Sequence, residues 1–246
     1  MKALVQFLLR PFGLHLIRLA NVQGPTFGSG VLFATLQRFG FSPRHVLDVG
    51  ANHGNWTREA LKYFPNAEYV LLEPQDHLKA HVQDLIDSGK KIRWINAGAA
   101  DKSGTMRFYI SDRDDSSTFL SRAELPQTRV ASETDVQVKT LDEIVSTYGL
   151  PAPDMVKIDA EGFDLRVIRG ASSLIGKTDV FLLEAGVICP FENSVGRVIC
   201  TMENLGYRLL DITELNRSPK HGVLWLTELA FLRKASPLLS SVTSYE

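Results

Sequence analysis

Two glycines and an acid stand close together in the stretch DVGANHGNWT, residues 48–57. Asp48 follows an apolar run. Gly50 comes two residues later, and Gly54 four residues after Gly50. Because glycine has no Cβ, both positions allow a sharp turn and the close approach of backbone to a ligand. A helix that begins near Asn55 would point its free amides at the same place. The pattern predicts a cofactor site at the end of a strand.

A carboxylate at the end of the next predicted strand narrows the choice of cofactor. Glu73, followed by Pro74, is placed to accept both hydroxyls of a ribose. A dinucleotide site prefers G-x-G-x-x-G, whereas here Asn52 and His53 fill positions that such a site keeps small. An acid ahead of the first glycine suits an amino-acid tail better than a phosphate. We therefore expect S-adenosyl-L-methionine, with a nicotinamide dinucleotide as the alternative.

Small residues end the third predicted strand in NAGAAD, residues 96–101. Gly98, Ala99 and Ala100 would leave a slot for a flat adenine, and Asp101 is placed to accept from its exocyclic amine. The alternative is a tight turn between strand and loop that holds no ligand.

A second group of ionisable residues lies in MVKIDAEGFDLRVIRGA, residues 155–171. Lys157, Asp159 and Glu161 alternate, so on a strand they project to one face near its carboxyl end. Such groups are costly to bury without partners, which favours a functional cluster. The alternative is an ion-pair network that closes the junction between strand and helix.

These side chains suit the activation of a hydroxyl. A neutral alcohol is a weak nucleophile, and a nearby base assists its attack. Asp159 is the first candidate base, followed by Glu161 and His53. A divalent ion on Asp159, Glu161 and Glu184 would instead acidify the hydroxyl. We favour transfer without a metal, because methyl transfer to oxygen depends mostly on alignment and the exclusion of water.

The elements that must position these residues alternate between strand-like and helix-like segments. Continuous apolar strands alternating with helices predict an α/β fold with a mostly parallel sheet covered on both faces. The polar stretch 112–129 is predicted to be a loop over one edge of the sheet, where Ser116 and Ser117 are candidates for a lid over an acceptor. The predicted strands are 45–51, 67–74, 91–99, 104–111, 134–141, 154–162, 180–186, 207–213 and 223–234, and the predicted helices are 55–64, 76–89, 163–175 and 193–207.

Composition limits the classes of function. The chain has 246 residues and a formal net charge of −1, so we expect no nucleic-acid partner. Cys189 and Cys200 form no CxxC pair, which argues against a zinc site or a disulfide framework and fits a reducing cytoplasm. We expect an N-terminal helical appendage over residues 1–40, one domain over 41–235 and a tail over 236–246.

The N-terminal stretch, residues 1–23, has apolar residues at helical spacing, interrupted by charges and Pro11. These interruptions argue against a spanning helix, which needs about 20 mostly apolar residues. We expect this helix to pack on the domain or on a second copy of the chain. A basic amphipathic helix resting on a membrane surface is the alternative, and it would add membrane association to a cytoplasmic protein.

The residues quoted above resemble those of the FkbM family of S-adenosylmethionine-dependent methyltransferases. The resemblance covers roughly residues 45–233, and the K-I-D-x-E-G signature within it is fairly specific. It implies a seven-stranded class I methyltransferase fold whose last strand runs antiparallel. It also implies methylation of a hydroxyl on a sugar, a polyketide or a lipid-linked glycan. The matching segments are DVGANHGNWT (48–57), LLEP (71–74), NAGAADKSGTMRF (96–108), VKTLDEI (138–144), VKIDAEGFDLRVIRGA (156–171) and LLE (182–184).

The resemblance also implies roles for single residues. Glu73 would hold the ribose, Ala99 to Asp101 the adenine, and Lys157, Asp159 and Glu161 would face the acceptor. Ala160, Asp164 and Glu228 depart from the family's common residues and leave the cofactor assignment intact. The residues expected at the cofactor are Asp48, Gly50, Ala51, Asn52, Gly54, Trp56, Thr57, Glu73, Pro74, Gly98, Ala99, Ala100, Asp101 and Asp159.

Two other functions stay open on sequence grounds. A nucleotide-dependent oxidoreductase or epimerase would also use a Rossmann-like sheet, but the glycine spacing and the lack of a Tyr-x-x-x-Lys pair count against it. A non-catalytic module that kept only the cofactor pocket is disfavoured by the intact Lys157, Asp159 and Glu161.

Overall fold

The computed structural model describes residues 28–113, 116–121, 123–124, 129–188, 192–240 and 242–243. The helix expected over residues 1–23, with its packing, membrane and dimer alternatives, lies outside the described residues, as does Cys189. No helix within the described ranges combines the length and the apolar character that crossing a membrane requires.

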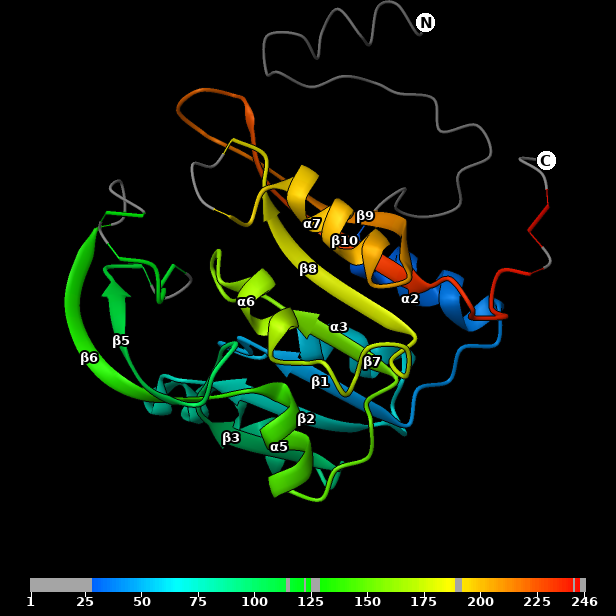
Figure 1. Cartoon of the computed structure of the whole chain (residues 1–246). Coiled ribbons are helices and arrows are strands. Elements are labelled where there is room, and N and C mark those ends of the chain that lie inside the picture. The colour runs from blue at the N-terminus through cyan, green and yellow to red at the C-terminus, as the bar shows by residue number, and fades with distance from the viewer. Residues whose placement is uncertain are drawn as a thin grey trace, which may run out of the picture.

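A seven-stranded sheet lies at the centre of the fold, with the strand order β3-β2-β1-β7-β8-β10-β9 (Figure 1). β10 is antiparallel to both of its neighbours, and the other pairs in this sheet are parallel. The predicted class I methyltransferase architecture is therefore confirmed. The strands are β1 (His45–Val49), β2 (Glu68–Glu73), β3 (Ile92–Asn96), β7 (Met155–Ile158), β8 (Val180–Gly186), β9 (Tyr207–Arg217) and β10 (Leu224–Arg233).

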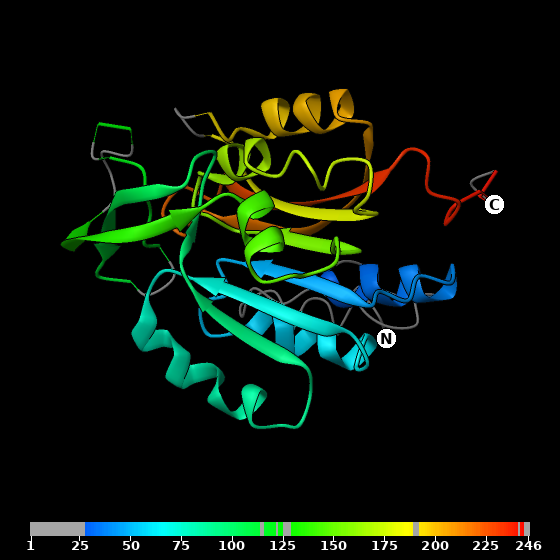
Figure 2. The ribbon, with the colours of Figure 1, turned by 60° about the horizontal axis from the view of Figure 1, so that its bottom comes forward.

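Helices cover both faces of this sheet, as Figure 2 shows. One face packs on α5 (Leu141–Thr147), α6 (Asp164–Arg169) and α7 (Val195–Asn204). The other packs on α2 (Ser29–Arg38), α3 (Asn55–Tyr63), and η2 (Asp76–Val82) with α4 (Gln83–Ile86). Because the central strands are covered on both sides, they are apolar at nearly every position, which is why they could be predicted from continuous runs.

Helix α2 falls within the segment expected to be an appendage. Its residues Leu32, Phe33 and Leu36 are fully buried against α3 and the sheet. Leu238 and Leu239 of the expected tail also pack against this core. The domain boundaries themselves stay a prediction.

A second, three-stranded sheet lies at one end of the main sheet (Figure 1). We call this sheet and its connecting segment, residues 98–113, 116–121, 123–124 and 129–139, the arm. The sheet contains β4 (Gly98–Ala99), β5 (Gly104–Ser111) and β6 (Val130–Lys139) in the order β4-β6-β5. The predicted strand 91–99 is therefore two strands, because the chain leaves the main sheet after Asn96 and Gly98 pairs with Val138.

Several predicted elements differ in extent from those observed. The strand predicted over 134–141 ends at Lys139, because Thr140 caps a helix: its hydroxyl accepts from the Glu143 amide at 3.0 Å. The helix predicted over 76–89 consists of η2 followed by α4, although one apolar face is buried throughout. The helix predicted over 163–175 corresponds to α6. It ends at Arg169, where Gly170 packs closely against the carbonyl of Ala100.

Candidate functional site

A pocket opens at the carboxyl ends of β1, β2, β4 and β7, with the arm forming one wall. This is where an open parallel sheet binds its ligands, next to the point where the strand order reverses. The predicted residues that line it are Gly50, Asn52, Glu73, Pro74, Gly98, Ala99, Asp159 and Glu161. The lining residues that sequence reasoning did not place there are Val49, Leu72, Gln75, Ala97, Phe108, Phe119 and Ala160, together with Ser117, which was expected in a lid.

The first turn of the pocket is built around Gly50. Its φ of 74° is left-handed, and a Cβ added there would lie 1.9 Å from the carbonyl oxygen of Asp159. Gly54, with a φ of 75°, ends the turn and begins α3. Both glycines allow the predicted sharp turn. Gly50 brings the β1 turn against the β7 turn, whereas a Cβ on Gly54 would lie 2.7 Å from the Val82 side chain.

The Glu73 carboxylate is oriented by two backbone amides. One oxygen accepts from the Asn52 amide at 3.0 Å, and the other accepts from the Gln75 amide at 3.0 Å. Burial raises the pKa of Glu73, and these two amide bonds oppose the shift. Each carboxylate oxygen keeps a further lone pair for a ligand hydroxyl.

Lys157 is the buried cation of the site. Its ammonium donates to the Gly50 carbonyl and to an Asp159 carboxylate oxygen, both at 3.2 Å, and lies 3.6 Å from Asp48. Asp48 is fully buried, and its other oxygen accepts from the Thr57 hydroxyl at 2.5 Å. Burial raises the pKa of Asp48, while Lys157 opposes that shift. Lys157 therefore ties the two turns together electrostatically.

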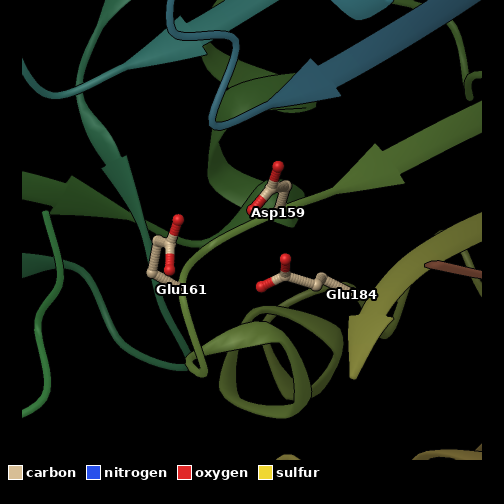
Figure 3. A group of neighbouring side chains, drawn as sticks. All are labelled: Asp159, Glu161 and Glu184. Carbon is tan, nitrogen blue, oxygen red and sulfur yellow. The ribbon is translucent and has the colours of Figure 1, made fainter. Parts of the chain in front are cut away.

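Three carboxylates face one another beside this network (Figure 3). One oxygen each of Asp159, Glu161 and Glu184 lie within 4.8 Å of one another. Asp159 follows the end of β7, Glu161 sits in the next turn with a left-handed φ of 49°, and Glu184 lies on β8. Burial, and then the charges of Asp159 and Glu161, raise the pKa of Glu184 well above its usual range. Three oxygens at this separation suit either a shared proton or a hard divalent cation.

The even alternation expected for Lys157, Asp159 and Glu161 holds only as far as Asp159. β7 ends at Ile158, and Glu161 reaches the cluster through its left-handed backbone instead of through strand geometry. The ion-pair network expected as the alternative is present, and an acidic cluster lies beside it, whose functional role stays a prediction. Lys157 belongs to the network, Glu161 belongs to the acidic cluster, and Asp159 belongs to both.

Aromatic residues of the arm lie beside Gly98, at the edge of the place expected to hold adenine. A Cβ on Gly98 would lie 2.4 Å from the ring of Phe119, and that ring lies 4.7 Å from the ring of Phe108. Gly98 thus makes room for a side chain of the protein. The signal that could have revealed Phe119 is its position, since it is a large apolar residue within an otherwise polar stretch.

Several residues near the start of α3 were expected to take part in the site, but they lie behind the residues that line the pocket. Trp56 packs edge-on against Phe33, with ring centroids 5.4 Å apart. Ala51 is buried in the core beneath the turn. His53, also a candidate base, stacks on His81 of η2 at 4.1 Å.

The two last residues of the expected adenine site also point elsewhere. Ala100 is fully buried against Gly170 and does not line the pocket. The Asp101 carboxylate lies 3.9 Å from the Arg169 guanidinium, away from the pocket lining. Roles for these residues stay predictions.

The chain is similar to known methyltransferases. The model of the family described as "Methyltransferase FkbM domain" matches residues 48–209. The curated 2-O-methyltransferase NoeI of Sinorhizobium fredii is 25% identical over 144 residues, which is 54% of this chain and 59% of that protein. The chain thus spans less than two thirds of the length of this relative.

Solved structures with a similar fold are more distant in sequence. Precorrin-6y C5,15-methyltransferase from Geobacter metallireducens is 14% identical, with a TM-score of 0.46 over 86% of this chain and 92% of that chain. The 1,6-didemethyltoxoflavin-N1-methyltransferase of Burkholderia thailandensis is 11% identical, with a TM-score of 0.44 over 83% of this chain and 76% of that chain.

Proposed function

Because the chain belongs to the FkbM methyltransferase family, we propose that it is an S-adenosylmethionine-dependent O-methyltransferase. The observation that carries this proposal is the pairing of two features across one pocket. Glu73 presents a carboxylate held by two amides on one side, and Asp159 and Glu161 present carboxylates on the other. The first feature suits a ribose, and the second suits a hydroxyl that must lose its proton.

The cofactor would lie along the strand ends. Glu73 would accept from the ribose hydroxyls, and the turn from Gly50 to Asn52 would approach the methionine portion. Adenine would lie beside Pro74 and Ala99, against the wall that the arm supplies.

The reaction would be an in-line displacement. An oxygen of the acceptor forms a bond to the methyl carbon as the bond from that carbon to the sulfonium sulfur breaks, which releases S-adenosylhomocysteine. The hydroxyl proton passes to the Asp159 carboxylate and then to solvent. Lys157, whose ammonium donates to the Asp159 carboxylate at 3.2 Å, fixes the direction of that carboxylate.

We propose that this transfer proceeds without a metal, as the sequence favours. The contact of Asp159 with Lys157 supports this choice, because an ammonium is already paired with this carboxylate of the pocket lining. Glu161 and Glu184, with Asp159, remain the residues that would hold a divalent cation. Activity in the presence of a chelator separates the two possibilities.

The acceptor would carry a hydroxyl on a sugar, a glycan or lipid-linked glycan, or a polyketide-like molecule. The name of the Sinorhizobium relative, a 2-O-methyltransferase, supports an oxygen acceptor. The net charge of −1 supports an acceptor other than nucleic acid. Membrane contact and dimerisation through the N-terminal residues stay predictions.

The proposal is tested by incubating the full chain with methyl-tritiated S-adenosylmethionine and a panel of mono- and oligosaccharides, glycolipid extracts and polyketides. We expect label in a product that survives alkali, because a methyl ether resists the base that hydrolyses a methyl ester. Cofactor binding without transfer to any acceptor would indicate a non-catalytic module. Binding of NAD in place of S-adenosylmethionine would indicate the oxidoreductase alternative.

A further inference from the structure

The backbone of Glu161 is held in a conformation that a residue with a side chain rarely adopts. Its φ of 49° is left-handed, and Gly162 after it has a φ of 90°. Such a conformation costs free energy and persists where the surroundings determine it. The contacts that fix Glu161 therefore decide where its carboxyl group lies.

Thr118 of the arm makes one of these contacts. Its hydroxyl donates to the Glu161 carbonyl at 2.9 Å and accepts from the Leu120 amide at 3.1 Å. A carbonyl can only accept and an amide N–H can only donate, so the direction of the single hydroxyl proton is fixed. The Thr118 residue is 1% exposed, which leaves no water to replace the bond.

The arm holds Thr118 firmly in this place. The Thr118 amide donates to the Tyr109 carbonyl at 3.0 Å, and the Tyr109 amide donates to the Thr118 carbonyl at 2.9 Å. The neighbouring Phe119 ring lies 5.4 Å from the ring of Phe163, which follows Glu161 by two residues. The arm thus contacts the turn through a hydroxyl at Glu161 and through an aromatic ring just beyond it.

We propose that Thr118 is a positioning residue, which holds the Glu161 turn so that the Glu161 carboxyl faces Asp159 and Glu184. This inference rests on the proposed function, which places Glu161 on the acceptor side of the pocket. Thr118 touches neither cofactor nor acceptor in this account. It acts through the Glu161 backbone and makes the arm a determinant of turnover.

The test compares Thr118→Val, which keeps the shape but removes the hydroxyl, with Thr118→Ser, which keeps the hydroxyl. Thr178→Val is the matched control, because Thr178 is fully buried and its hydroxyl donates to the Pro153 carbonyl at 2.8 Å, next to the starts of β7 and β8. With the saccharide or glycolipid that the wild type methylates, we expect kcat to fall about tenfold in Thr118→Val. It should stay within about twofold of wild type in Thr118→Ser and Thr178→Val. The dissociation constant of S-adenosylhomocysteine should change less than about twofold in all three variants.

Hydrogen exchange supplies a readout that needs no acceptor. We expect the backbone amides of residues 159–163 to exchange about tenfold faster in Thr118→Val, and at the wild-type rate in Thr118→Ser and Thr178→Val. Thr118→Ala serves in the same way if the valine variant does not fold. Unchanged exchange with unchanged kcat would overturn the inference. A wild type that methylates nothing would instead count against the proposed function, while the exchange experiment would still decide the role of Thr118.

Discussion

The carbonyl oxygen of Asp159 occupies the space that a side chain at Gly50 would need. A Cβ at Gly50 would lie 1.9 Å from that oxygen, and the Gly50 carbonyl accepts from Lys157, whose ammonium also contacts Asp159. The turn after β1 and the turn after β7 are therefore fitted directly to each other. The proposed cofactor side and the proposed acceptor side of the pocket meet at this contact.

Replacing Gly50 with alanine should distort both turns. We expect Gly50→Ala to lower the free energy of unfolding by about 2–4 kcal/mol, from the left-handed φ and the backbone clash together. Urea denaturation measures this loss. Gly89→Ala is the control, since Gly89 has a φ of +75° with no atom within 4 Å of an added Cβ, and it should cost only about 1 kcal/mol. Equal losses in the two variants would show that the contact with Asp159 is unimportant.

Removing the Lys157 ammonium should show how much the buried charge of Asp48 destabilises the fold. Asp48 is fully buried and would lose the charge of its partner in Lys157→Met, so we expect the free energy of unfolding to fall by about 3–5 kcal/mol. The loss should grow as pH rises, because a carboxyl whose folded pKa is raised further destabilises the fold when it ionises. Adding Asp48→Asn should recover part of it. Lys91→Met, which breaks an exposed ion pair with Glu68, should cost less than about 1 kcal/mol. A Lys157 variant as stable as the Lys91 control would contradict this assignment.

Glu228 should give the protein a stability that declines toward neutral pH. Burial raises its pKa to about 7, although the hydroxyls of Thr213 and Ser29 donate to its carboxylate. The folded pKa lies above the unfolded value, so the stabilising contribution is complete below about pH 4.5 and is lost as pH rises through about 7. We expect a loss of about 2–3 kcal/mol over this window.

Urea denaturation between pH 4.5 and 8 tests this dependence. The curve of Glu228→Gln should be flatter than that of the wild type by the same amount, because the amide does not titrate. Glu133→Gln, at an exposed position of β6, should leave the curve of the wild type unchanged. Parallel curves for wild type and Glu228→Gln would refute the prediction.

The acceptor-side chemistry makes a separate prediction for Asp159. We expect Asp159→Asn to lower kcat about 100-fold while the affinity for S-adenosylhomocysteine stays within a few-fold, because a lost general base affects the transition state. Asp84→Asn, on an exposed ion pair with Arg58, should match the wild type. The wild type should also keep its activity in EDTA. Loss of activity in EDTA with recovery on adding Mg²⁺ would instead assign Asp159, Glu161 and Glu184 to a cation.

Much of the main sheet could be predicted because its strands are local and continuous in sequence. The apolar run before Asp48 and the run before Glu73 each end in an acid and a turn residue, so the strand ends and the pocket edge followed directly. Helix α5 could have been predicted too, since Thr140 and Glu143 form a capping pattern in TLDE. The residues before this helix have a strand-like pattern, so the strand was predicted to continue through Thr140 and Leu141.

The arm and its contacts could not be predicted in the same way. Phe119 meets Gly98, and Thr118 meets Glu161, through contacts between segments that are distant in sequence. No local pattern encodes such pairs. Asp101 is a further example, because its distance to Arg169 depends on where α6 ends. Sequence identified the residue types of the site, whereas tertiary packing decided which of them face the pocket.

Calorimetric titration of the full chain with S-adenosylhomocysteine tests the central claim most directly. We predict binding at a single site, no heat with NAD, and an affinity at least about tenfold weaker in Glu73→Gln, where an amide replaces a carboxylate that would bind the ribose. Glu59→Gln, at a half-buried position of α3 outside the pocket lining, should bind as the wild type does. Binding of NAD, or binding of S-adenosylhomocysteine that is indifferent to Glu73, would contradict the account.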